Sequence, residues 1–398
     1  MRQIFSSVAA LLLVLGPITV APQIAYAATP VIVVGTKSAA CPDAQSSTIQ
    51  AAVDAASPGT VIRICPGTYP EQVSITKPLS LRGENGVVIE PSNVVMNTTS
   101  TAPGAASLAA IILVKDTTDV DIQDVIVDGT NNGLTACGPD FIGVLYQNAS
   151  GEAKRVAVRN VKLSPSLNGC QSGSAILVQS GGGQVSKVDV EDSSIHDYQK
   201  NGITANEVET EARIENNVVT GIGPTTGTGA AQNGIQIGYG AKGSITKNTV
   251  ANHIWSPCVS LASCNVTFAV DILVIESDGV SVEQNLAGVS QVGIDIVGNH
   301  AQVSENQVFD TLIFDGIELK GNDNDARDNS ITHSNQAGVF IKGNNNDVRQ
   351  NRINEAAYGV LKTAGFTGNV IRRNDFSNVL VMVQDPAGRG GSEASPYR

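Results

Sequence analysis

Apolar and polar residues alternate through the carboxy-terminal third of the chain, and the alternation recurs at a nearly constant period. Between residues 293 and 376 one short pattern appears four times, as GIDIVGNHAQVSENQV, GIELKGNDNDARDNSI, GVFIKGNNNDVRQNRI and GVLKTAGFTGNVIRRNDF. The opening glycines lie 23, 22 and 21 residues apart and are Gly293, Gly316, Gly338 and Gly359. Period-two alternation indicates strands with one buried face, and the period is too short for two packed helices. The pattern therefore predicts a solenoid that adds one coil per repeat.

The strand direction in such a solenoid follows from its geometry. Each coil ends one rung above its start, so equivalent strands stack in parallel, about 4.8 Å apart. Right-twisted strands favour right-handed crossovers, which predicts a single-domain, all-β, right-handed parallel β-helix. A second alternating run in each copy ends at an asparagine, namely Asn306, Asn329, Asn351 and Asn374. Because asparagine tolerates a left-handed backbone and its amide can bond to the next rung, we expect these residues to stack at a tight turn.

The amino-terminal residues 1–27 have the features of an export signal. Arg2 is followed by the apolar run 8–15 and by the small-residue cleavage site Ala25-Tyr26-Ala27. The apolar run is too short for a comfortable membrane span, and no later stretch is long and apolar enough. We therefore expect a secreted or periplasmic protein, with the β-helix domain over residues 28–384 and a polar tail over 385–398.

The segment after the signal predicts a cap for the first coil. Ser47 or Thr48 can cap a short helix over residues 49–56, whose apolar positions fall on one face and can cover the open end of the solenoid. The stretch TIQAAVDAA…GTVIRICPGTYPEQVSITKPLSLRG resembles the opening of the pectin-lyase-like β-helix superfamily. That opening is shared by pectin methylesterases, by periplasmic accessory proteins of nitrous-oxide reductase and by other secreted proteins. The resemblance implies the fold and is not specific for one activity.

Cysteine content and charge narrow the class of protein. Six cysteines in an exported chain form an even set, and their spacing suggests three disulfides, Cys41–Cys65, Cys137–Cys170 and Cys258–Cys264. The chain has no CxxC pair or histidine–cysteine cluster, which argues against a zinc site. The formal net charge of −12 argues against nucleic acid as a partner.

The coils before residue 293 are lengthened by insertions. The strand equivalent to GIDI recurs at intervals of 24 to 35 residues, starting at Gly143, Ala175, Gly202, Gly234 and Ala269. The extra residues fall just before this strand, as in SPSLNGCQSGS and HIWSPCVSLASCNVTF. Insertions at one corner collect along one side of a solenoid, so we expect a binding cleft there.

Acidic residues mark that cleft. If the first apolar residue of each strand points inward, the next points outward, and three consecutive rungs then present Asp271, Asp295 and Glu318 in one column. Carboxylates about 4.8 Å apart repel each other and require a cation, or a shared proton and a raised pKa. Asp315 adds a fourth acid at the loop corner, and Lys320 follows on the same face. We therefore predict a catalytic site made of Asp271, Asp295, Asp315, Glu318 and Lys320.

Two kinds of chemistry suit this column, and a third interpretation assigns it none. Paired carboxylates can hydrolyse a glycosidic bond, one as the acid and the other as the base or nucleophile. Alternatively Asp271, Asp295 and Glu318 hold Ca²⁺, which neutralises a uronate while Lys320 removes the adjacent proton. The third interpretation is that these acids are ordinary solvated side chains.

Polar and aromatic residues near the insertions are candidate substrate ligands. They are Tyr198, Lys200, Gln232, Gln236, His253 and Trp255, and the last is the only tryptophan, whose ring could stack on a sugar. Loop packing is the alternative role for each. The strand FDGIEL is similar to the NTDGFDI strand of polygalacturonases, which implies acid roles for Asp315 and Glu318. The paired-Asp and Gly-His-Gly strands of that family are missing.

These observations together indicate the class of function. We expect a secreted carbohydrate-active protein that acts on an extended polysaccharide, as a glycoside hydrolase or a polysaccharide lyase. The alternative is a non-catalytic glycan-binding or cell-surface β-helix protein.

Overall fold

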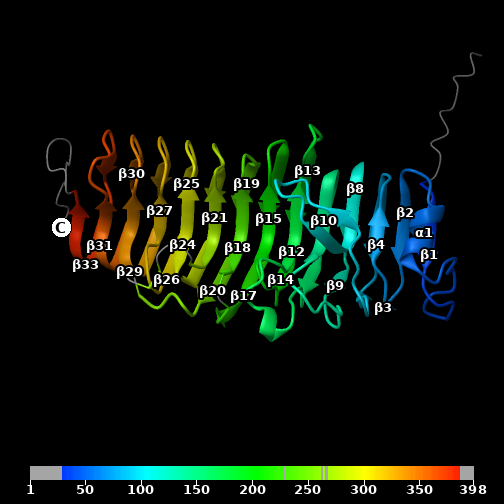
Figure 1. Cartoon of the computed structure of the whole chain (residues 1–398). Coiled ribbons are helices and arrows are strands. Elements are labelled where there is room, and N and C mark those ends of the chain that lie inside the picture. Colours follow the sequence, from blue (N-terminus) through cyan, green and yellow to red (C-terminus); the bar gives the residue numbers. More distant parts are fainter. Residues whose placement is uncertain (1–28, 228, 261–262, 265–267, 386–398) are drawn as a thin grey trace, which may run out of the picture.

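The computed structural model describes residues 29–385, apart from 228, 261–262 and 265–267. The predicted signal, and the predicted tail beyond Asp385, lie outside the described residues. The strands coil about one axis in chain order from β1 to β33, so the expected parallel β-helix is confirmed (Figure 1). One helix, α1 (Ile49–Ala55), lies at the amino-terminal end beside β1 and β2.

Each coil has three strands that form three parallel faces. The first face contains β4 (Val73–Ile75), β12 (Ser174–Gln179), β15 (Asn201–Asn206), β18 (Asn233–Gly238), β21 (Val270–Ile275), β24 (Val292–Val297) and β27 (Ile317–Leu319). The long strands β8 (Ser107–Gln123) and β10 (Asp140–Lys154) begin on this face and continue onto the second. A short strand, β7 (Thr98–Thr99), pairs antiparallel with β8.

The second face follows the first in every coil. It contains β1 (Val31–Val34), β2 (Thr60–Ile64), β5 (Leu79–Gly83), β13 (Ser186–Glu191), β16 (Thr210–Glu215), β19 (Lys242–Thr246), β22 (Ser281–Glu283), β25 (Gln302–Ser304), β28 (Asp325–Arg327), β30 (Asp347–Arg349) and β32 (Val370–Arg372).

The third face completes the coil. It contains β3 (Gly67–Tyr69), β6 (Val87–Ile89), β9 (Ile126–Asp128), β11 (Ala157–Arg159), β14 (Ser194–His196), β17 (Val218–Thr225), β20 (Thr249–Trp255), β23 (Leu286–Ser290) and β26 (Gln307–Thr311). The last strands start here and run back onto the first face; they are β29 (Ser330–Ile341), β31 (Arg352–Lys362) and β33 (Asp375–Gln384). A 3-10 turn, η1 (Pro165–Leu167), lies in one insertion.

The interior is one continuous column of stacked apolar side chains. On the first face Val274, Ile296 and Leu319 stack from rung to rung, and none of them is exposed. The alternating residues Leu273, Asp295 and Glu318 lie on the outer side of the same strands. The period-two pattern thus predicts correctly which residues of the regular coils are inside.

Stacked asparagines form the turn between the second and third faces, as predicted. The backbone N–H of Asn306 donates to Oδ1 of Asn329 at 3.0 Å, and its side-chain amide donates to the carbonyl of Val282 at 2.9 Å. The ladder also extends backward to residues that the repeat alone did not reveal, Asn217, Asn248 and Asn285. The left-handed residue is not the asparagine, however, but the one before it: Glu305, Asp328, Gln350 and Arg373 have φ between 54° and 57°.

The predicted cap and disulfides are also present. Helix α1 starts after Thr48, and the Glu71 carboxylate accepts the backbone N–H groups of Ile49 and Gln50 at 2.7 and 2.8 Å. This carboxylate satisfies N–H groups that have no partner within the helix. Disulfides join the six cysteines in the predicted pairs, Cys41–Cys65, Cys137–Cys170 and Cys258–Cys264. Within the described residues, no helix is long and apolar enough to cross a membrane.

Candidate functional site

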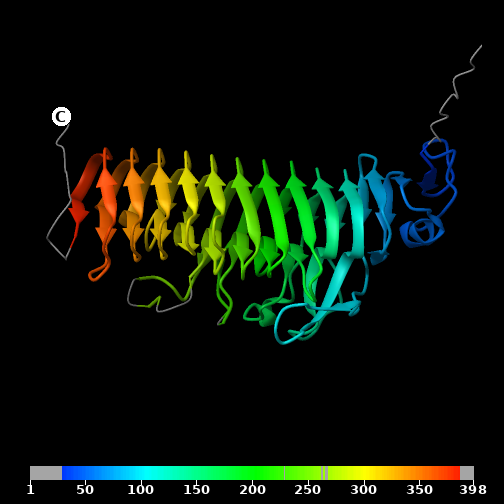
Figure 2. The same ribbon diagram turned by 90° about the horizontal axis from the view of Figure 1, so that it is seen from above.

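The insertions lie at one corner of the solenoid, as predicted. They connect the third face to the first before β10, β12, β18 and β21, and they project from one side of the stack of strands (Figure 2). The Cys137–Cys170 disulfide joins the first two insertions. The outer surface of the first face therefore has a wall of loops beside the inserted coils.

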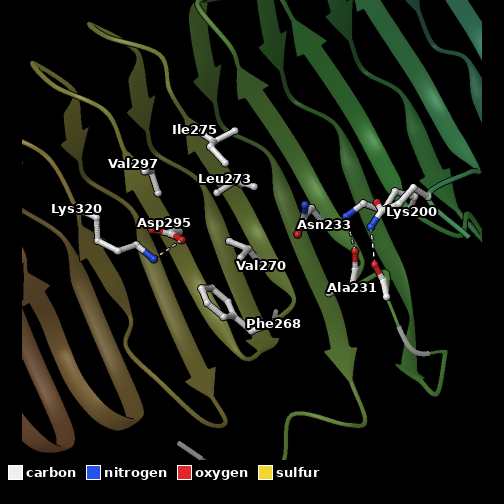
Figure 3. A pocket seen from close by; sticks show the side chains of 12 residues that line it. Lys200, Ala231, Asn233, Phe268, Val270, Leu273, Ile275, Asp295, Val297 and Lys320 are labelled. Atoms are coloured by element: carbon white, nitrogen blue, oxygen red, sulfur yellow. Dashed lines mark hydrogen bonds and ion pairs between the residues drawn. The ribbon is translucent and has the colours of Figure 1, made fainter. Parts of the chain in front are cut away.

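A hollow of about 450 Å³ crosses the first face next to this wall, and we call it the groove. Figure 3 shows its lining, in which β21 supplies an apolar floor through Val270, Leu273 and Ile275. Polar and aromatic residues lie around this floor, namely Gln171, Lys200, Asn233, Phe268, Asp295 and Lys320. The groove thus runs diagonally, from residues before β15 to the residue that follows β27.

One end of the groove contains two carboxylates that share a lysine. The pairing of β24 with β27 places Asp295 beside Glu318. The Lys320 ammonium lies 2.7 Å from Oδ2 of Asp295 and 2.6 Å from Oε2 of Glu318. It also lies 5.0 Å from the centre of the Phe268 ring, within the range of a cation–π contact. Three of the predicted catalytic residues therefore meet at one point.

The environment of this cluster changes its acid–base chemistry. Burial, and the negative charge of Glu318, raise the pKa of Asp295 to about 7 although Lys320 opposes the shift. Burial alone would lower the pKa of Lys320, but the carboxylates of Asp295 and Glu318 outweigh it and raise that pKa. Lys320 is therefore held in its protonated form, which corrects the prediction that it acts as a base. Asp295 is the group that can exchange a proton near neutral pH.

Asp315 lies beside this cluster, as predicted. Its Oδ1 accepts the backbone N–H of Ala337 at 2.7 Å, and its side chain is buried just before β27. Burial, and then the neighbouring Glu318 carboxylate, raise the pKa of Asp315 well above its usual value. Asp315 thus lies at the corner beside Glu318, where its environment favours the protonated form.

Asp271 is not part of the column, which corrects the prediction. The pairing of β21 with β24 places Leu273, not Asp271, beside Asp295, and Asp271 lies at the level of Gly293. A Cβ on Gly234, which occupies the same level one rung earlier, would approach atoms of Val250 and His253 to 2.3 and 2.9 Å. This position therefore points into the interior. Because the strand sequence VDILVI is apolar at nearly every position, its alternation did not define the register.

Asp271 belongs instead to a polar network inside the solenoid. Its Oδ1 lies 2.6 Å from Nδ1 of His253, whose Nε2 is bonded to the hydroxyl of Tyr198. Gln232 also lies inside and donates to the carbonyl of Tyr198 at 2.5 Å. All four side chains are fully buried. Tyr198, Gln232 and His253 are thus not exposed substrate ligands, because polar residues at the loop corner can also turn inward and bond to one another.

The other predicted substrate ligands have separate positions. Lys200 lines the groove, and its ammonium donates to the carbonyl of Ala231 at 2.7 Å. Burial lowers the pKa of Lys200 to about 8. Gln236 is a buried member of the outer column and donates to Asn206, whereas Trp255 donates to the carbonyl of Gly227 and fixes that loop. Only Lys200 of the six therefore lies in the groove lining.

Phe268 is the aromatic lining residue that the sequence did not identify. It ends the longest insertion, two residues before the start of β21, and the centre of its ring lies 5.1 Å from that of Phe314. An aromatic residue at the end of a polar insertion is the signal that could have identified it.

The predicted calcium site does not form. Asp271 is separated from the other two acids, and the Lys320 ammonium occupies the space between Asp295 and Glu318 that a cation would need. In the part of the chain that the structure describes, no three His, Cys, Asp or Glu side chains are grouped to hold a metal ion. Lys320 supplies the positive charge that the paired carboxylates require.

One family model matches part of the chain. The family is described as periplasmic copper-binding protein (NosD), and its model matches residues 260–390. The periplasmic family and the three disulfides agree with the predicted secreted or periplasmic location. The described residues do not fit a copper site, because the histidines are apart: His253 is paired with Asp271 inside, and His333 with Asp310 outside.

Solved structures with a similar fold include two enzymes and a tailspike protein. The A-module of mannuronan C-5 epimerase AlgE4 from Azotobacter vinelandii has a TM-score of 0.59 at 16% identity, covering 86% of this chain and 94% of that one. The GH136 lacto-N-biosidase from Eubacterium ramulus has a TM-score of 0.58 at 12% identity, covering 87% and 68%. The Dettilon tailspike protein (gp208) has a TM-score of 0.53 at 11% identity, covering 82% and 63%. None of the curated proteins compared with this chain matches its sequence. The chain therefore has the right-handed parallel β-helix fold of pectin-lyase-like proteins.

Proposed function

We propose that this protein is a secreted glycoside hydrolase that binds an extended polysaccharide in the groove and cleaves it with Asp295 and Glu318. The proposal rests on the carboxylates of Asp295 and Glu318, which both contact the Lys320 ammonium. The contacts of 2.7 and 2.6 Å to Lys320 place the two bound oxygens no more than about 5.3 Å apart. Retaining glycosidases have carboxyl groups about 5 to 5.5 Å apart, whereas inverting ones need about 6.5 to 9.5 Å.

The two carboxyl groups would have different roles. With its pKa of about 7, Asp295 carries a proton for part of the time at neutral pH and can give it to a leaving oxygen. Glu318, next to it and bonded to Lys320, would be the carboxylate that attacks or stabilises the sugar cation. Phe268 and the apolar floor of β21 would contact the sugar rings.

The geometry favours hydrolysis over elimination. A lysine can act as the base of an elimination only when its amine is neutral, and Lys320 is held protonated. Lys200, whose pKa is about 8, lies before β15, three rungs from Asp295 on β24. Three rungs correspond to about 14 Å along the axis, too far for the two groups to act on one bond.

The similar structures support the substrate class. Two of them are named as a mannuronan epimerase and a lacto-N-biosidase, and both names refer to carbohydrates.

One observation favours a second candidate, a non-catalytic glycan-binding protein. The side chains of Asp295 and Glu318 are only 3% and 6% exposed. A buried ion cluster can exist for structure alone, since it positions strands without exchanging protons. In that case the groove would bind a glycan through Lys200, Asn233 and Phe268 and would not cleave it.

The test is a screen of the mature protein against neutral and acidic polysaccharides, following new reducing ends and the ultraviolet absorbance of unsaturated uronates. Hydrolysis should produce reducing ends without absorbance. Asp295→Asn should lower the rate by about 10² to 10⁴ and leave the protein folded. Because the acid form is needed, kcat/KM should fall as the pH rises through about 7.

The matched control is Asp375→Asn, which changes an exposed carboxylate on the third face. It should not affect cleavage. Binding without cleavage, with Asp295→Asn binding as well as the wild type, would support the second candidate. Ultraviolet absorbance from unsaturated uronates would indicate elimination and would contradict the proposed hydrolase activity.

A further inference from the structure

A second hollow of about 500 Å³ adjoins the groove, along the edge where the strands of the first face end. We call it the shelf. Its floor is formed by Gly298, Gly321 and Gly343, and its lining also includes Glu276, Asp278, Lys342 and Phe366. Val297 and Lys320 line both the groove and the shelf, so the two hollows are continuous.

Close stacking of the coils determines the floor of the shelf. A Cβ on Gly298 would lie 2.0 Å from the carbonyl oxygen of Ser277, and one on Gly321 would lie 1.9 Å from that of Gly298. The same holds at Gly343, where the distance to the oxygen of Gly321 is 1.7 Å. Only glycine therefore fits at these three rungs, which keeps side chains out of the floor; Gly321 is partly exposed there, whereas Gly298 and Gly343 are buried.

Hydrogen-bonding groups follow this strip. Each glycine is followed by an asparagine, and the side-chain amide of Asn322 donates to Asn299 at 3.2 Å while that of Asn344 donates to Asn322 at 3.1 Å. An amide nitrogen has two hydrogens, so one on each of these asparagines remains for a ligand oxygen. Lys342 is exposed, and it forms no ion pair or side-chain hydrogen bond with the described residues. The half-buried ring of Phe366 adds an aromatic surface at the far end.

We infer that the shelf is a second glycan-binding site, which holds the part of the polysaccharide chain that extends beyond Lys320. This inference rests on the proposed function of the groove. Hydroxyl groups suit the asparagine amides and the Lys342 ammonium, and a sugar ring suits the face of Phe366. From Lys200 before β15 to Lys342 after β29 there are five rung steps, or about 24 Å along the axis. The bound ligand is thus a long oligosaccharide and not a disaccharide.

The test measures affinity against chain length. Two size-fractionated series, oligomannuronates and cello-oligosaccharides from disaccharide to octasaccharide, are titrated calorimetrically into the protein that carries Asp295→Asn, so that no cleavage occurs. Affinity for the series that binds should increase until the chain spans both hollows. Adding Lys342→Gln and Phe366→Ala should weaken binding of the longest oligomers about tenfold and leave the shortest unchanged.

The matched control is Lys242→Gln, an exposed lysine on the second face that makes no ion pair with the described residues. It should not change the length profile. The shelf proposal would be contradicted if affinity stopped increasing at the shortest oligomers, or if the Lys342 and Phe366 substitutions did not alter the dependence of affinity on length. The groove proposal would be unaffected by either result. If neither series binds at any length, the proposed function and the shelf both fail.

Discussion

The four regular coils from residue 293 onward and the inserted coils before them share one interior but differ at one corner. In both regions apolar residues stack without exposure, as Ile237 does on β18 and Ile296 on β24. The asparagine ladder also runs through both, from Asn217 to Asn374. The connection from the third face to the first differs most: it is short in the regular coils and long before β10, β12, β18 and β21.

This difference separates the part of the molecule that makes the fold from the part that makes the site. The groove lies where the two regions meet: Phe268 ends the last long insertion, and Asp295 belongs to the first regular coil. Interior and ladder need the same residues at every rung, whereas the corner is free to vary. The loops can therefore build a binding wall without altering the stack that supports it.

The strongest test of a shared interior compares one charged substitution in each region. Ile296→Asp in the regular coils and Val274→Asp in the inserted coils each bury a charge at fully buried, adjacent positions. Each should lower the free energy of unfolding by at least about 4 kcal/mol, as measured by urea denaturation. Asp295→Asn, on the outer side, should leave the protein folded. A much smaller effect of Val274→Asp would show that loops and disulfides stabilise the inserted coils instead.

Alanine substitutions in the ladder should give a smaller effect, equal in the two regions. Asn329→Ala and Asn248→Ala each remove an acceptor for one buried N–H and a donor to one buried carbonyl. Each should cost about 3 kcal/mol, seen as equal shifts of the urea midpoint. Unequal costs would mean that the ladder is not one continuous structure. Asn354→Ala, at a position outside the ladder, is the control.

The smallest expected effect is on the pH dependence of stability. It concerns the buried polar network of Asp271, His253, Tyr198 and Gln232, which lies in the inserted coils. Burial raises the pKa of Asp271 well above its usual value and lowers that of His253 to about 3, so the buried pair holds one proton at neutral pH. The unfolded chain releases that proton above about pH 6.5. Stability should therefore fall as the pH rises above neutral, by up to about 1.4 kcal/mol per pH unit.

Between about pH 4 and 6.5 the unfolded chain also holds one proton, on its histidine, so the pair should contribute little pH dependence there. Asp271→Asn should remove the alkaline slope, measured as urea midpoints from pH 7 to 9. An unchanged slope in this variant would contradict the shared proton. Neighbouring Tyr198 stays neutral throughout, because burial raises its pKa well above the usual value.

The sequence predicted the fold and about half of the site, and the two regions explain the division. Where the period is constant, the alternation identified Asp295 and Glu318 as outward neighbours on consecutive rungs. Where insertions change the spacing, the alternation wrongly placed Asp271 beside Asp295, a position that Leu273 occupies. Apart from Asp271 the strand VDILVI is apolar, so no polar residue marks its outer side. The inward turn of Tyr198 and His253 could not be predicted, since it depends on contacts between rungs far apart in sequence.

The acid–base roles of the site residues could not be predicted from the sequence either. Lys320 was expected to be a base because it follows Glu318 on the same face, but a second carboxylate from the neighbouring rung holds it protonated. Such a shift depends on burial and on distances between strands, which residue spacing alone does not give.

The left-handed turn residue before each ladder asparagine has a consequence for how such a surface can change. Glu305, Asp328, Gln350 and Arg373 share nearly the same backbone angle although their charges differ. The turn therefore does not depend on the side chain at this position, which is left to vary. Along the solenoid these positions form a row at intervals of about 4.8 Å. Substitutions in this row can change the charge along the surface without changing the fold.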